Sequence, residues 1–224
     1  MKLVLLLLLG LAATVSLSAQ TTAGLWVGDI TLGQVNEVHA RQTTGATPTP
    51  VAKPFSMRVL LHVSATGQVS LLKEAVLMRT RGASPAPVIV TQMSLLANYD
   101  GTTVRGGQLI GQRFSTVSFP MSGDVLALTG GLAAGTSTTG TLALAANSPV
   151  NPFRHKYHPD LANAGRDVSR AISIAINAGE TPADHVLNGT WTETLTGLHT
   201  SAITVTGSLV LNRVSTVDQL NNTP

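Results

Sequence analysis

The segment Met57-Arg58-Val59-Leu60-Leu61-His62-Val63, with its return Val69-Ser70-Leu71-Leu72-Lys73, is the clearest hairpin signal in this sequence. Its first arm alternates aliphatic residues at every second position, as a strand with a buried face does. Ala65-Thr66-Gly67-Gln68 supplies a short turn. Because Leu60 also places an aliphatic side chain on the other face, we expect both faces to be covered and the hairpin to lie centrally in a sheet.

The same alternation continues on both sides of this hairpin. Trp26, Ile30 and Leu32 share one face of a predicted strand near the N-terminus. The isoleucines of the segment 172–176 stand at every second position, which a helix would place about 200° apart, so we predict a strand there. A second hairpin runs through residues 190–196, turns near Gly197 to Ser201 and returns through residues 203–211.

Further elements are less regular. We predict strands in the segments 88–91, 108–119, 124–128 and 141–144, and an exposed loop from Gln42 to Pro54. The glycine-rich stretch Gly130 to Gly140 links Val125–Leu128 to Thr141–Leu144, and these two arms are expected to pair.

These patterns predict an all-β fold, an antiparallel β-barrel or β-sandwich of roughly nine or ten strands without a major helix. The order Gly-x-Trp followed closely by an acidic residue occurs at Gly24–Asp29 and again at Gly189–Glu193. Either the match arises by chance, or the first and last strands are neighbours in a closed barrel.

Residues 1–19 have the composition of a secretory signal peptide. Lys2 precedes an apolar run that ends near Val15, and Ser18 and Ala19 supply small residues for cleavage. The apolar run is shorter than the roughly 20 residues of a membrane-spanning helix. We therefore expect residues 20–224 to form a single β-domain that is secreted, periplasmic or on the surface of a bacterial cell. The chain has no cysteine, so its stability must come from a packed core.

Composition narrows the possible partners. Only 11% of residues are charged and the formal net charge is +3, which is no electrostatic footprint for nucleic acid. Aromatic residues amount to 4%, too few for the two aromatic girdles of a transmembrane barrel. We expect partners among surface or periplasmic proteins or glycans, and no membrane-spanning segment.

Three stretches together resemble an uncharacterised β-rich module of secreted and surface proteins of bacteria. They are Pro54-Phe55-Ser56-Met57-Arg58-Val59-Leu60-Leu61-His62-Val63 with the following Gly67–Glu74, the segment Asn151–Asp160, and Gly189–His199. The resemblance covers most of residues 24 to 214. It implies secretion and an all-β module, and it implies no catalytic residues because no activity belongs to that module.

The stretch Asn151-Pro152-Phe153-Arg154-His155-Lys156-Tyr157-His158-Pro159-Asp160 concentrates chemistry that the rest of the chain lacks. A first hypothesis is a ligand-binding loop, in which charged and aromatic side chains contact an anion or glycan: Arg154, His155, Lys156, Tyr157 and His158. A second is a divalent metal site formed by His155, His158 and Asp160, which would need a further ligand such as His185, Glu193 or His199. In a third, the aromatic residues plug the end of the fold and Arg154 pairs with Glu193 or Asp160.

Catalytic motifs are absent from the sequence: it contains no G-x-S-x-G, no H-E-x-x-H and no cysteine nucleophile. We therefore predict a structural or interaction module without enzymatic activity or resident cofactor. The alternative is a small-ligand or metal-binding barrel that uses the 151–160 loop, and a hydrolase is third. Paired carboxylates for glycoside hydrolysis would have to come from the following residues: Glu74, Glu180, Glu193, Asp29, Asp124 and Asp184. A binding barrel predicts a cavity of about 300 Å³ or more beside the loop, whereas a structural module predicts a filled interior.

Glu193 is the one charge on an otherwise apolar face of its strand. Either that face is the outer one, or Glu193 has a buried partner, for which Arg213 and Arg58 are candidates.

Overall fold

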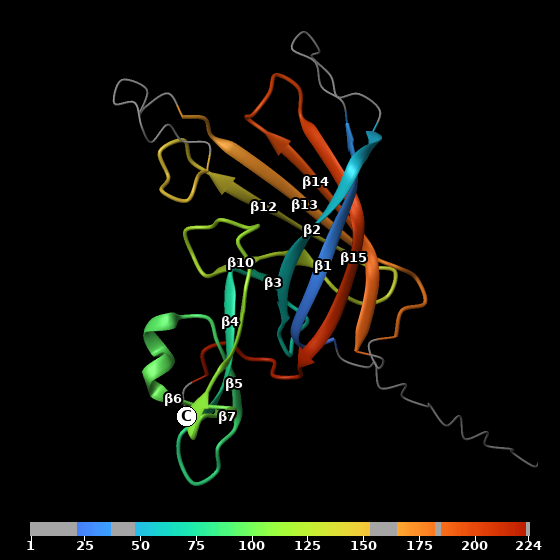
Figure 1. Cartoon of the computed structure of the whole chain (residues 1–224). Helices are drawn as coiled ribbons and strands as arrows, with labels where there is room; N and C mark the ends of the chain where they lie inside the picture. The colour runs from blue at the N-terminus through green and yellow to red at the C-terminus, as the bar shows by residue number, and fades with distance from the viewer. Residues whose placement is uncertain (1–21, 37–47, 153–164, 182–184, 223–224) are drawn as a thin grey trace, which may run out of the picture.

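A computed structural model describes residues 22–36, 48–152, 165–181 and 185–222 (Figure 1). Its main feature is a nine-stranded antiparallel sheet with the order β10-β3-β2-β1-β15-β14-β13-β12-β11. The strands are β1 (Gly24–Asn36), β2 (Pro48–Val63), β3 (Val69–Leu72), β10 (Val125–Ala127), β11 (Thr129–Gly130), β12 (Ser137–Leu144), β13 (Val168–Ile176), β14 (Val186–Thr196) and β15 (Ile203–Ser215).

The sheet curls into a nearly closed barrel because its two outer strands belong to one segment. β10 pairs with β3, β11 pairs with β12, and only Leu128 separates β10 from β11. The backbone N–H of Leu128 donates a hydrogen bond to the carbonyl of Val69 at 2.9 Å, so the junction itself is paired. The all-β prediction is confirmed, and of its two architectures the structure is the barrel, which leaves few free strand edges.

Most of the predicted pairings are confirmed. β2 and β3 form the predicted hairpin, with Val63 opposite Val69, and β14 and β15 form the C-terminal one. The prediction that the first hairpin lies centrally in the sheet is wrong, because β3 and β2 are second and third from the edge strand β10. β1 pairs with β15 along its length, so the first and last strands of the barrel are neighbours. The segment of isoleucines 172–176 lies within strand β13.

The predicted pairing of Val125–Leu128 with Thr141–Leu144 is wrong. β10 pairs with β3 instead, and β12 pairs with β13, while only Thr129 and Gly130 reach β12. Gly130 has a positive φ of 111°, and a Cβ there would lie 2.1 Å from the carbonyl oxygen of Ser137. The chain therefore turns back on itself directly after β11, and the arm before Leu128 is left to complete the other edge of the sheet.

The predicted loop Gln42 to Pro54 is wrong from residue 48 onward. β2 begins at Pro48, and its first residues pair with β1 after a register shift between Leu32 and Gln34. Proline cannot donate a ladder hydrogen bond, but this half of β2 pairs with β1 alone, since β3 reaches only Leu61 to Val63. Residues 42–47 lie outside the described residues.

A smaller antiparallel sheet, the satellite sheet, packs against the outside of the barrel (Figure 1). The chain enters it directly after β3. The predicted strand 108–119 is interrupted there, because it contains two short strands, Gln108–Ile110 and Gln112–Ser115. The elements of the satellite sheet and the adjoining ones are β4 (Glu74–Thr80), β5 (Pro87–Val90), β6 (Tyr99–Gly101), β9 (Gln112–Ser115), the hairpin β7 (Thr103–Arg105) and β8 (Gln108–Ile110), and the 3₁₀ helix η1 (Met93–Asn98). Leu60 of β2 and Ile89 of β5 belong to the apolar cluster between the two sheets. The prediction that both faces of β2 are covered is thereby confirmed.

The C-terminal residues tie the satellite sheet to the barrel. Leu220 forms a parallel bridge with Ile89, and the Asn221 side chain accepts hydrogen bonds from the backbone N–H groups of Thr91 and Gln92. Val217 packs on the same cluster and its carbonyl contacts His62. This segment covers apolar surface that would otherwise face water.

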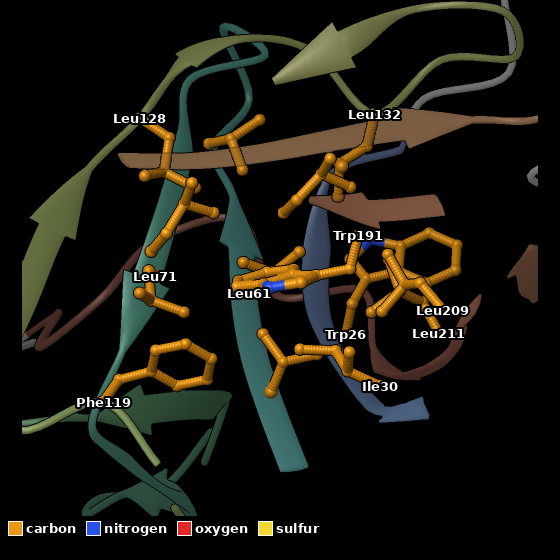
Figure 2. Packing of buried hydrophobic residues seen from close by; sticks show 14 of the residues in the cluster. Trp26, Ile30, Leu61, Leu71, Phe119, Leu128, Leu132, Trp191, Leu209 and Leu211 are labelled. Carbon is orange, nitrogen blue, oxygen red and sulfur yellow. The ribbon is translucent and has the colours of Figure 1, made fainter. Parts of the chain in front are cut away.

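Large side chains fill the barrel interior (Figure 2). Trp26 and Trp191 are fully buried there. Trp191 lies opposite Gly207, and Gly28 and Gly189 likewise face Leu211 and Leu209 across the ladder. Glycines opposite bulky residues let two indoles share a small barrel, in which large and small side chains commonly alternate.

We expect Gly207→Ala to destabilise the barrel by about 2 kcal/mol or more, because the added methyl group would lie 2.3 Å from the carbonyl oxygen of Thr31. Gly33→Ala is the matched control on the neighbouring strand, since nothing lies within 4 Å of a Cβ there. It should change the free energy of unfolding by no more than about 0.5 kcal/mol. Urea unfolding of both variants measures the difference, and equal effects would contradict the packing argument.

We expect stability to fall as the pH drops below about 6.5, through His62. His62 is 3% exposed, and burial lowers its pKa, although the Val217 carbonyl and Asp218 oppose the shift. The unfolded chain therefore binds the proton more readily than the folded one, so stability is present above the unfolded pKa and is lost as pH falls toward the folded value.

Urea unfolding between pH 8 and pH 5, compared for the wild type and His62→Gln, measures this contribution. The wild type should lose more stability than the variant across that range. Parallel losses would show that His62 does not carry the effect.

Candidate functional site

Barrel strands, β1, β14 and β15 among them, begin or end at one end of the barrel, the end farther from the satellite sheet (Figure 1). We call it the loop end and define it by the described residues Asn36, Asn151, Arg166 and 197–202. It is where β1 ends, where β12 leads toward the 151–160 stretch, and where β14 turns into β15. Asn151, the first residue of the histidine-rich stretch, therefore lies at this end of the barrel.

Two buried asparagines hold the bases of these connections. The amide of Asn36 donates to the carbonyl of Ala202 at 2.9 Å, and its side-chain oxygen accepts the N–H of Thr204. The amide of Asn151 donates to the carbonyls of Ala145 (3.1 Å) and Arg166 (2.9 Å). Since buried amides without such partners would be costly, both side chains fix the backbone around them.

The predicted site residues Arg154, His155, Lys156, Tyr157, His158 and Asp160 lie outside the described residues. The structure places only the two ends of their stretch, at Asn151 and Arg166, which the Asn151 side chain joins directly. Three further metal ligands were considered. His199 lies at the loop end, and His185 precedes β14 at the opposite end. Glu193 forms an ion pair with Arg170 inside the barrel. Within the described ranges, no group of three or more His, Asp or Glu residues could hold a metal ion.

Glu193 does point into the barrel, and its partner is Arg170. Arg170 donates through Nε and Nη2 to the two carboxylate oxygens, and through Nη1 to the carbonyl of Ser118 at 2.6 Å. Glu193 is only 2% exposed. The guanidinium also lies 5.1 Å from the ring centroid of Phe119, whose ring in turn lies 5.4 Å from that of Trp191. The bidentate pair is thus enclosed by aromatic and backbone atoms.

Two of the predicted partners of Glu193, Arg58 and Arg213, are wrong, and the third, Arg154, lies outside the described residues. Arg58 is exposed on β2, and Arg213 donates to the carbonyl of Ala23 and lies over the ring of Trp26. The ladder explains the choice: Glu193 is opposite Ile172, so the next inward residue on that neighbouring strand is Arg170. The sequence does indicate this partner. Arg170 lies an even number of residues from Ile172, Ile174 and Ile176, so all four side chains are on the same face of the strand.

The segment before β10 closes the barrel over this pair. The Thr116 hydroxyl donates to the carbonyl of Arg58 on β2, and the Ser118 carbonyl accepts from Arg170 on β13. β1, β15 and β14 separate β2 from β13 in the sheet, so the segment spans the barrel and carries Phe119 into its core. The filled interior agrees with what we expect of a structural module.

A hollow of about 410 Å³ lies at the loop end, outside this core. We call it the mouth hollow. The described residues that line it are Arg166, Gly197, Leu198, His199 and Thr200. It meets the size that we expect of a ligand site near the 151–160 stretch. Of these lining residues, only His199 was predicted from the sequence as a candidate site residue.

No protein-family model matches this chain, and no curated protein is detectably similar to it. The resemblance to secreted β-rich modules therefore stays a prediction. The described part of the chain contains no helix of the length and apolarity that crossing a membrane requires.

The described carboxylates considered for glycoside hydrolysis lie on different elements. Glu74 pairs with Arg113 on the satellite sheet, Glu180 accepts hydrogen bonds from Asn188, and Glu193 is bound by Arg170. Asp184 lies outside the described residues.

Replacing one member of the buried pair, as in Arg170→Met or Glu193→Leu, should cost about 3–5 kcal/mol of stability, because the remaining charge stays buried without its partner. The double variant Arg170→Met/Glu193→Leu should recover most of that loss. Arg81→Gln, which removes an exposed ion pair with Asp100 at 3.4 Å, is the control and should cost less than about 1 kcal/mol. Guanidinium unfolding measures all four variants, and additive losses in the double variant would contradict the assignment.

Proposed function

We propose that this protein is a secreted, non-catalytic interaction module of a bacterial cell that binds its partner through the loop end of the barrel. The observation that carries the proposal is the combination of a filled interior with anchored loop bases. Trp26, Trp191 and Phe119 occupy the space in which a small barrel would hold a ligand. Binding is then left to the surface.

The loop end is suited to binding because its connections start from a rigid frame. Asn36 and Asn151 tie adjacent connections together through buried hydrogen bonds. Loops held by a rigid scaffold carry binding residues in many β proteins. The 151–160 stretch, with its cationic and aromatic side chains, starts from this frame, so we assign it the contact with a surface protein or glycan.

Secretion is supported by the sequence of residues 1–19 and by the scarcity of charge in the rest of the chain. The second candidate, a small-ligand or metal-binding barrel that uses the same loop, gains support from the mouth hollow at its base. A hydrolase gains no comparable observation from the described carboxylates.

Replacement of residues 153–164 by a Gly/Ser linker of equal length tests the proposal. We expect binding to at least one component of a panel of cell-wall sacculi, capsular polysaccharides and purified surface proteins to weaken about tenfold or more. The reason is that the loop carries the cationic and aromatic contact groups. Replacement of residues 182–184 at the opposite end by Gly-Ser-Gly is the control.

Sedimentation and biolayer interferometry measure the binding, and thermal unfolding verifies that both variants stay folded. Equal binding by the wild type and the loop variant would overturn the assignment of the loop. Release of a soluble product from any panel component would overturn the absence of catalysis.

A further inference from the structure

We infer that the mouth hollow binds a small ligand through an oxyanion group, a carboxylate or a sulfate. The inference rests on the proposed function, because the hollow lies at the same loop end and would define the chemistry that this end recognises. The described residues that line it are Arg166, Gly197, Leu198, His199 and Thr200.

Specific contacts fix the backbone around the hollow. The carbonyl of Arg166 accepts a hydrogen bond from Asn151, which has no exposed surface. Gly197 has a positive φ of 92°, and a Cβ there would lie 1.9 Å from the carbonyl oxygen of Asp167. The β14–β15 turn therefore packs directly on the chain after Arg166, and this contact brings His199 and Thr200 beside Arg166.

Among the described residues that line the hollow, Arg166 supplies the only formal charge. Asp167, the nearest acidic residue in sequence, accepts the backbone N–H of Ala146 at 2.7 Å. Glu193 is buried and neutralised by Arg170. Arg166 belongs to none of the ion pairs formed among the described residues, and its side chain is exposed at the hollow. A guanidinium in this position favours a planar or tetrahedral oxyanion.

The remaining donors complement that charge. Nδ1 of His199 accepts the backbone N–H of Ser201 at 3.1 Å, so the neutral ring carries its proton on Nε2 and presents a donor there. The Thr200 hydroxyl lies 3.4 Å from Nδ1 of the same ring. Leu198 adds an apolar contact on which a sugar ring could rest. A volume of about 410 Å³ lies within the range of small-molecule sites. The set of donors and the size together fit an acidic monosaccharide unit or a sulfate group.

Titration of the folded protein with sodium sulfate, sodium glucuronate and glucose, followed by ¹H–¹⁵N NMR, tests the inference. At constant ionic strength we expect saturable shifts of the Gly197 to Ser201 amides with at least one of the two anions and none with glucose. Arg166→Gln should weaken binding about tenfold or more. Arg105→Gln, on the exposed β7–β8 hairpin, is the matched control and should bind as the wild type does.

Equal binding by Arg166→Gln and Arg105→Gln, or shifts that do not saturate, would overturn the inference by showing only general charge screening. Glucose binding with the same affinity would overturn it as well. A difference between sulfate and glucuronate identifies which oxyanion the site takes. The variant in which the linker replaces residues 153–164 keeps Arg166 and residues 197–200, so it should retain anion binding. If that variant loses partner binding while the wild type binds no anion, the inference of an anion site in the hollow is refuted. The proposed function of the loop end is then unaffected.

Discussion

The closure of the barrel at Leu128 is the constraint on which the rest of the structure depends. One short segment completes both edges of the sheet, pairing with β3 before Leu128 and with β12 after it. An open sheet of this length would leave two rows of unpaired backbone groups. With the ring closed by a segment of six residues, Val125–Gly130, the interior volume is set, and the side chains that enter it must fit that volume.

Closure explains why the interior combines such different residues. Trp191 fits because Gly207 stands opposite it on the neighbouring strand, and Trp26 is followed two residues later by Gly28, which faces Leu211. Arg170 and Glu193 are enclosed together, which costs desolvation of both groups but leaves neither without a partner. The segment that carries Phe119 then covers the pair. In a chain without disulfides, these specific contacts fix one arrangement of strands among the many that a repetitive Thr- and Gly-rich sequence would allow.

Because the interior of the barrel is filled, a ligand or partner must bind on its surface. The two ends of the molecule differ in the groups that they expose there. One end is joined to the satellite sheet, where the C-terminal segment and His62 lie under apolar cover. The loop end instead exposes Arg166 and the β14–β15 turn on a frame held by buried asparagines. An anchored backbone lowers the entropy lost on binding, so few polar contacts suffice for a useful affinity.

Local pattern by itself determined the strands: alternation at Trp26, Ile30 and Leu32, or at Ile172, Ile174 and Ile176, has the period of a strand and needs no tertiary information. The paired tryptophan motifs suggested that the first and last strands are neighbours, which they are, although β15 separates β1 from β14, the strand that carries the second motif. Only the tertiary structure decided that Arg170 is the partner of Glu193, because that contact depends on the register between two strands. It alone also decided that β10 pairs with β3 and that residues 48–54 join β2, since pairing over long sequence separations is set by closure of the whole sheet. The mouth hollow belongs to the same class: Arg166 and His199 lie far apart in sequence, and two turns folded against each other bring them together.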